Sequence, residues 1–372
     1  MKKHQFMGPF LVLCLFISGC AGLPVSRPLP AGVSSTNVAV TEDGPFAADP
    51  AGQLLAYIRQ GLRVTDLVSK TDSLITPDKP VALAWSPDGK RLAAAFSGLE
   101  KSKIRLYAAN GSKLGEAELA GTIGDLAWRS PDELLIASVL MTNYKFGSDF
   151  QQLLGRWDGK AEPTHIRIHN ATLRQGTVRH LGADFAKSFS FRVSPLGDEI
   201  AFTRLHDPPE FSAYLRVMLH HLSTGSEREV SNIDLPGAAP FYTSNGDQLL
   251  VADGKGKITR VDPWQENSAT VLPLTGKSLV ASPSGNYLLI DGQLITGREL
   301  VTSFPETVKG QFTSQGTRLF IQHNDTIFLI SGFSSGLNQL PVGESREKLL
   351  TLRSWRYQGL ITPEDFLKSQ PH

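Results

Sequence analysis

Short apolar runs recur along the chain, and each follows a turn rich in Ser, Pro, Asp and Gly. The clearest turn is Ser86-Pro87-Asp88-Gly89, which leads into the apolar run from Leu92 to Phe96. Pro at the second position of a turn fixes φ, and Gly at the fourth accepts a left-handed backbone. The run is apolar at consecutive positions, which is typical of a strand packed on both faces. The pattern therefore predicts tight turns that lead into buried strands.

Seven such turns lie 31 to 64 residues apart, at 49–52, 86–89, 130–133, 194–197, 243–246, 282–285 and 313–316. The residues that define them are Pro50, Gly52, Pro87, Asp88, Gly89, Pro131, Pro195, Gly197, Gly246, Pro283, Gly285 and Gly316. A second apolar run usually follows the first, and the spacing centres on the ~40–50 residues of a propeller blade. We therefore expect an all-β propeller over residues 41–343, with seven blades of four antiparallel strands.

Two alternatives stay open at this point. An ordinary β-sandwich with seven strand pairs would also show short strands and frequent turns, although seven similar units favour the propeller. Six or eight blades also fit, because the 64-residue gap before Ser194 could hold an insertion or a degenerate blade.

The turn-and-strand units resemble the repeats of TolB-type, WD-like bacterial propellers. The resemblance covers roughly residues 41–340; it is strong at 86–89 and 194–197 and weak at 243–246 and 313–316. It implies a scaffold in which the turns build the blades and the loops carry the function.

The first residues predict export. Lys2 and Lys3 precede an apolar run over 10–17, which is too short to span a bilayer and is typical of a secretory signal. The run ends in Ile17-Ser18-Gly19-Cys20, which resembles the lipobox of bacterial lipoproteins. That resemblance implies cleavage between Gly19 and Cys20, a lipid on Cys20, and residues 1–19 as the signal peptide. The alternative is a signal cut elsewhere, with Cys20 an ordinary thiol.

The resemblance also places the mature chain. Ala21 stands where an Asp would favour retention in the inner membrane, so the family pattern implies an outer-membrane lipoprotein that faces the periplasm. Residues 20–40 are rich in Pro and Ser and are expected to be a tether between lipid and propeller. Cys14 leaves with the signal, so no thiol remains for a disulfide or for thiol catalysis.

Charge changes the picture little. The formal net charge is +1, and it becomes −1 without residues 1–19, which hold Lys2 and Lys3 and no acids. Because nucleic-acid binding depends on neutralising phosphates, we expect no nucleic-acid partner.

The last residues change character. Residues 347–355 favour a helix that ends near Gly359, and Thr362-Pro363 is typical of the start of another. The segment 344–372 resembles the SHOCT module through Gly359-Leu360-Ile361-Thr362, Glu364 and Phe366. The resemblance implies docking or oligomerisation through Leu352, Trp355, Leu360, Ile361 and Phe366. A helical cap on the last blade is the alternative, because two short helices cannot bury a core alone.

No motif for catalysis stands out. The stretch 332–336 fits G-x-S-x-G, but a nucleophile elbow needs a following helix and a downstream His, and only His372 follows. His165 and His169 share a face, yet a metal site needs three or four ligands. We expect no catalytic residue, no metal and no cofactor.

These observations predict a non-enzymatic lipoprotein, anchored in the outer membrane through Cys20, whose propeller is a scaffold for an unidentified protein of the cell envelope. Self-association through the C-terminal helices is a further expectation. The alternative is a ligand-binding or hydrolytic propeller, with residues that converge from several blades on the mouth of the central channel.

Overall fold

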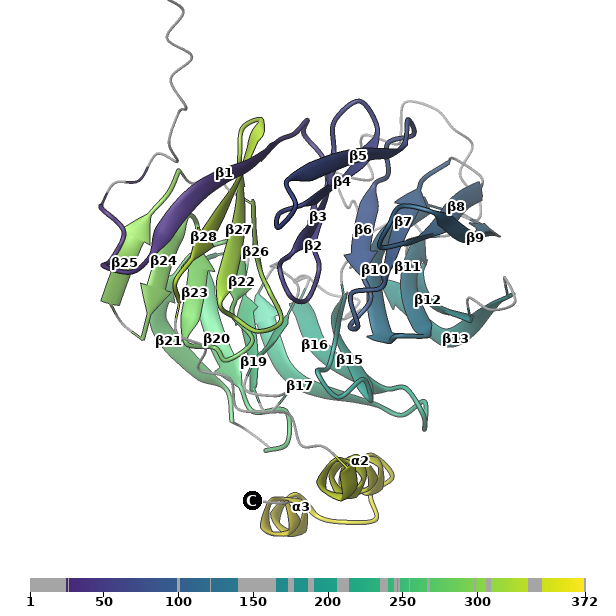
Figure 1. The fold of residues 1–372 in the computed structure, drawn as a ribbon. Helices are drawn as coiled ribbons and strands as arrows, with labels where there is room; N and C mark the ends of the chain where they lie inside the picture. The colour runs from purple at the N-terminus through teal and green to yellow at the C-terminus, as the bar shows by residue number, and fades with distance from the viewer. Residues whose placement is uncertain are drawn as a thin grey trace, which may run out of the picture.

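The computed structural model describes residues 25, 27–98, 101–120, 122–139, 165–172, 177–186, 191–205, 214–234, 240–243, 246, 248–253, 255–265, 268–297, 299–305, 309–333 and 343–370. Within them, 28 strands form seven four-stranded antiparallel sheets, and two helices follow (Figure 1). The fold is an all-β propeller with blades of four antiparallel strands, as the sequence predicts. No helix among these residues is long and apolar enough to cross a membrane.

Six sheets consist of strands that are consecutive in the chain. They are β2 (Ala47–Ala48), β3 (Leu54–Ile58), β4 (Leu62–Asp66) and β5 (Thr71–Thr76); β6 (Ala82–Trp85), β7 (Arg91–Phe96), β8 (Lys101–Ala108) and β9 (Lys113–Ala120); β10 (Thr122–Ser130), β11 (Glu133–Val139), β12 (His165–Thr172) and β13 (Thr177–Ala186); β14 (Phe191–Val193), β15 (Glu199–Leu205), β16 (Tyr214–His221) and β17 (Glu227–Asp234); β18 (Phe241–Thr243), β19 (Gln248–Ala252), β20 (Lys257–Val261) and β21 (Thr270–Thr275); β22 (Leu279–Ala281), β23 (Tyr287–Ile290), β24 (Gln293–Thr296) and β25 (Glu299–Ser303).

The seventh sheet closes the ring with both ends of the propeller sequence. It contains β26 (Lys309–Phe312), β27 (Arg318–His323) and β28 (Thr326–Ser331), with β1 (Ser34–Val40) as the outermost strand. β1 pairs with β28 from Ser34 opposite Ser331 to Val40 opposite Thr326. The predicted boundary between tether and propeller at residue 40 is therefore wrong, because the polar residues 34–36 lie in an exposed outer strand, which needs no apolar face.

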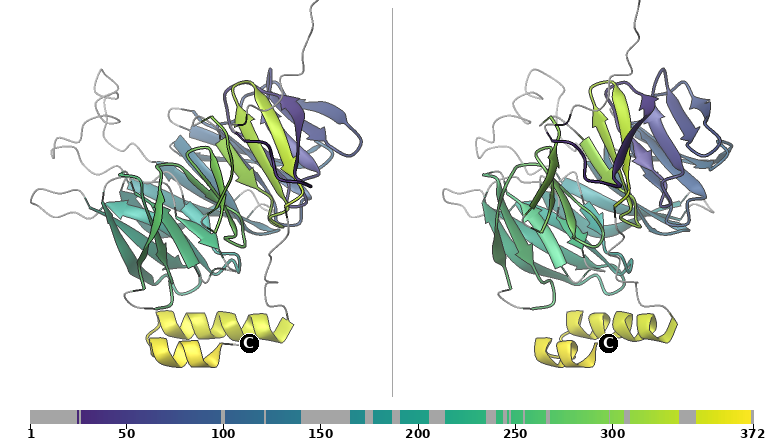
Figure 2. Two further views of the ribbon diagram at one scale, coloured as in Figure 1. Left: turned by 90° about the vertical axis from the view of Figure 1, so that its left-hand side faces the viewer. Right: turned by 60° about the vertical axis from the view of Figure 1, so that its left-hand side comes forward.

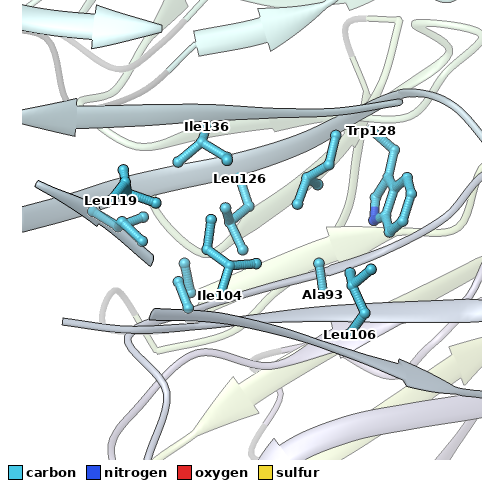
Figure 3. Close-up of a cluster of buried hydrophobic side chains, with 11 residues drawn as sticks. Ala93, Ile104, Leu106, Leu119, Leu126, Trp128 and Ile136 are labelled. Atoms are coloured by element: carbon cyan, nitrogen blue, oxygen red, sulfur yellow. The ribbon is translucent and has the colours of Figure 1, made fainter. Parts of the chain in front are cut away.

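The core lies between neighbouring sheets. Leu92, Ala93, Ala94 and Ala95 are fully buried, as their unbroken apolar run predicts. In Figure 3, Ala93, Ile104, Leu106 and Leu119 of one sheet pack against Leu126, Trp128 and Ile136 of the next. Two tryptophans also join neighbouring innermost strands by hydrogen bonds: the Nε1 of Trp85 donates to Ala47 O at 3.0 Å, and that of Trp128 to Ala84 O at 2.9 Å.

The turns after the innermost strands follow the sequence pattern. Gly52, Gly89, Gly197, Gly285 and Gly316 have φ between +67° and +74°, and each donates its backbone N–H to the residue three positions earlier. Asp88 closes its own turn by accepting hydrogen bonds from the Oγ of Ser86 and the N–H of Lys90. We call the side of the propeller with these turns the turn face. The opposite side, where segments such as 41–46 and 77–81 lead into innermost strands, is the entry face.

Helices α2 (Gly343–Tyr357) and α3 (Pro363–Ser369) form a C-terminal pair. Gly359 has φ +70°, and the N–H groups of Gly359 and Leu360 donate to the carbonyls of Arg356 and Trp355, which together end α2 as a Schellman motif. Thr362 caps α3 by accepting the N–H of Asp365, with Pro363 at the first turn. Figures 1 and 2 show the pair below the sheets.

Candidate functional site

The central channel is the first candidate site. The innermost strands of all seven sheets, β2, β6, β10, β14, β18, β22 and β26, line a cavity of about 710 Å³. Its wall mixes apolar and polar groups and includes residues Phe46 and Phe241, which are partly buried, and Trp85, Trp128 and Phe312, whose side chains are buried between the sheets. A concave, largely apolar site with a few polar groups is the usual form of a ligand pocket.

An ion pair lies in this wall. Arg192 of β14 approaches the carboxylate of Asp125 on β10 at 3.3 Å, and its guanidinium lies 4.8 Å from the ring centroid of Phe241. Burial raises the pKa of Asp125 above its ordinary value, and the positive charge of Arg192 opposes that rise. The pair brings a cation, a carboxylate and an aromatic ring from three sheets into one part of the channel.

Two further polar residues lie where the last sheet meets the first. The side chain of Gln311 on β26 accepts the backbone N–H of Ala48 on β2 at 3.0 Å. Lys309, at the start of β26, pairs with the exposed Asp43 at 2.6 Å, and this bond lowers the pKa of Asp43. Gln311 therefore helps to close the ring, and Lys309 places a second cation at the channel wall.

The second candidate is the contact between the C-terminal helices and the turn face. Leu349 and Leu352 of α2 and Phe366 of α3 are buried in a cluster with Leu196 and Trp264 of the propeller. Leu196 belongs to the turn 194–197, so the helices sit on the turn face. The rings of Trp264 and Phe366 lie 4.9 Å apart.

A buried ion pair fixes the same contact. Arg353 of α2 is fully buried, and its Nη1 donates to both carboxylate oxygens of Asp198 at 3.3 and 3.2 Å. Its guanidinium also stacks over the ring of Trp264, 4.5 Å from the centroid. Nearby, the Nη2 of Arg346 donates to the backbone carbonyl of Leu196 at 3.0 Å.

Glu199, the neighbour of Asp198, is the centre of a second polar group. It is fully buried and accepts hydrogen bonds from the hydroxyls of Tyr242 at 2.9 Å and Tyr357 at 2.6 Å. Burial, followed by the charge of Asp198, raises the pKa of Glu199 above its ordinary value. The ring of Tyr357 also stacks on His221 at 4.6 Å, and burial lowers the pKa of that imidazole.

The predicted docking residues divide into two groups. Leu352 and Phe366 are buried against the propeller, and Ile361 is partly buried in the same cluster. Trp355 and Leu360 are 45% and 64% exposed, so these two do not pack on the propeller, and their predicted role in docking or oligomerisation stays a prediction. Both lie on the side of the helical pair that the propeller leaves free. Helical pattern alone missed Arg353 and Tyr357, because a buried Arg is not distinguishable in sequence from a solvated one.

The other sequence candidates contribute no site here. Gly19, Cys20 and Ser334 lie outside the described residues, and so do the side chains of His165 and His169. The Nδ1 of His220 lies 3.2 Å from Glu227, within its own sheet. In the part of the chain that the structure describes, no three His, Cys, Asp or Glu side chains come together as metal ligands would.

No protein-family model matches the chain, and no curated protein is detectably similar to it. Among solved structures, TolB from Acinetobacter baumannii matches over 62% of this chain with 16% identity and a TM-score of 0.40. The match spans just 55% of the TolB chain. A similarity this low says nothing about shared function. The propeller fold is established by the sheet topology of the chain itself.

Proposed function

We propose that this protein is a non-enzymatic lipoprotein of the outer membrane, anchored through Cys20, whose propeller binds a protein partner in the periplasm. The lipobox-like Ile17-Ser18-Gly19-Cys20 and the following Ala21 support the anchor and its membrane. The central channel supports the binding function.

The composition of the channel is the observation that carries the proposal. Its wall mixes apolar and polar groups, Phe46 and Phe241 are only partly buried there, and Arg192 sets a guanidinium beside Phe241. Aromatic residues and Arg are the side chains most enriched at the centres of protein interfaces. The channel would therefore take an apolar segment of a partner that carries a carboxylate for Arg192.

Site-specific photo-cross-linking tests this function. A benzophenone amino acid at Phe241 should cross-link one defined partner in whole cells, and Arg192→Gln in the same chain should reduce the yield. The matched control carries the benzophenone at Leu114, a 54% exposed residue on the outer strand β9. Equal cross-linking at both positions, or no effect of Arg192→Gln, would count against the channel as the binding site.

The anchor has its own test. Cys20→Ala should abolish incorporation of radioactive palmitate and release the protein from the membrane fraction. Labelling that persists in this variant would disprove lipidation at Cys20.

The alternative is a ligand-binding or hydrolytic propeller, which the raised pKa of Asp125 beside Arg192 favours. Under this alternative, the protein should hydrolyse a chromogenic ester, phosphate or glycoside, and Asp125→Asn should abolish that activity. The binding proposal expects no such turnover and a change in cross-linking yield instead.

A further inference from the structure

The chain leaves the propeller on the entry face. Strand β25 ends at Ser303 on that side, where the following segment leads into β26. The carbonyl of Arg27 accepts a hydrogen bond from the Oγ1 of Thr302 at 2.9 Å, near this end of β25. Val25 and Leu29 pack against the cluster formed by the last two sheets. The segment before β1 therefore runs back along the propeller from the turn face to the entry face.

The C-terminal helices lie on the other side. They contact Leu196 in the turn 194–197, and both side views show them beyond the ends of the sheets (Figure 2). The N-terminal end of the described chain and the helical pair thus mark opposite faces of one propeller.

The tether is too short for the helical pair, instead of the entry face, to lie against the membrane. Four residues lie between Cys20 and Val25, which makes five residue-to-residue steps, and a fully extended chain spans at most ~3.6 Å per step, or about 18 Å in all. The six residues of β28 alone give a blade about 20 Å high, at ~3.3 Å per residue. The helices add a layer roughly 10 Å thick. Contact between the helical pair and the anchoring membrane would need about 30 Å of tether, which exceeds the available reach.

We propose that the entry face is turned toward the lipid surface that holds Cys20, and that the helical pair faces away from it. This orientation rests on the proposed lipid anchor. Two ion pairs lie at the rim of the entry face: Lys79 with Glu42, and Lys309 with Asp43. Each pair is neutral as a whole, so these four side chains do not repel zwitterionic or anionic headgroups. The helical pair then points into the periplasm.

Single-cysteine fluorescence tests the orientation, because the mature chain has no cysteine other than Cys20. Asp325→Cys places a label in the exposed turn between β27 and β28 on the entry face. Asn110→Cys places it in the exposed turn between β8 and β9 on the turn face and is the matched control. The lipidated, labelled proteins are inserted into phosphatidylethanolamine–phosphatidylglycerol vesicles that contain nitroxide-headgroup lipid.

We expect quenching of the label at position 325 to be several-fold stronger than at position 110. Equal quenching, or stronger quenching at position 110, in protein shown by mass spectrometry to carry lipid would overturn the orientation and leave the anchor intact. Absence of lipid from the protein would instead refute the anchor.

A longer tether provides the second variant. Twenty Gly and Ser residues inserted between Pro24 and Val25 remove the limit on reach, so the difference between the two positions should largely disappear. A difference that persists unchanged would show that tether length does not set the orientation.

Discussion

Loss of the buried charge at Arg353 is the sharpest test of how the helical pair is held. Arg353→Met keeps an apolar side chain over Trp264 but removes both hydrogen bonds to Asp198. Asp198 then stays buried without its counter-charge, although it keeps the hydroxyl of Ser194. Breaking a buried pair by removing one partner costs about 3–5 kcal/mol.

The free energy lost when this ion pair is broken is of the same size as the free energy of the apolar contacts that hold the helices. Leu349, Leu352 and Phe366 each contribute roughly 1.5–3 kcal/mol on burial, before the entropy of ordering the helices is subtracted. We therefore expect α2 and α3 to detach in Arg353→Met while the sheets stay folded. Urea unfolding followed by Trp fluorescence and far-UV circular dichroism measures stability, and limited trypsin digestion at Lys348 reports release of α2.

The controls separate charge from general damage. Ser345→Ala changes an exposed residue of the same helix, keeps the trypsin site at Lys348 and should alter stability by no more than about 0.5 kcal/mol. In a double-mutant cycle, Asp198→Asn with Arg353→Met should cost less than the two single changes together. A stability within 0.5 kcal/mol of wild type for Arg353→Met, or strictly additive effects, would refute the argument that this pair holds the helices.

Three further predictions address the same molecule. Burial raises the pKa of Glu199 above its ordinary value of 4.5, so ionisation of this carboxyl destabilises the folded state. As the pH falls from that raised pKa to 4.5, urea titrations should show the free energy of unfolding of wild type increasing relative to that of Glu199→Gln. A difference between the two proteins that does not change with pH would contradict this. Gly225→Ala should cost about 1–2 kcal/mol for its left-handed φ alone. Gly197→Ala should cost more in the same assay, since its Cβ would lie 2.7 Å from a backbone oxygen, and equal costs would exclude that clash. Truncation before Gly343 should keep the far-UV spectrum of the sheets while increasing binding of a hydrophobic dye at Trp264; an unfolded product would show that the helices complete the core.

The repeat could be predicted from sequence because its signals are local. Pro87 and Gly89 fix a turn through their own backbone preferences, and the apolar run that follows needs neighbours on both faces. The helix ends are equally local: Gly359 and Thr362 act on groups within a few residues of themselves. These features depend little on what the rest of the chain does.

The two sites could not be predicted because they are assembled from distant residues. Asp125 and Arg192 lie 67 positions apart, and Arg353 and Asp198 lie 155 apart. Nothing near Arg353 in the sequence says that it is buried, since an Arg in an amphipathic helix is usually solvated. The apolar residues Val38 and Ala39 of β1 do carry a local strand signal, but its first residues are polar and exposed, so the sequence does not show that the whole of β1 belongs to the last sheet.

The closure of the ring joins the propeller to the segment that precedes it. β1 is the strand that completes the last sheet, and it is also the first strand after the tether. Under the proposed lipidation of Cys20, force on that lipid would pass into the ladder between β1 and β28, and through it into the ring. The contacts of Val25, Leu29 and Arg27 lie ahead of that ladder, so they bear the force first. Loss of β1 would leave β28 as the outer strand of this sheet, at the edge opposite the channel wall formed by β26, so β1 completes the ring without lining the channel.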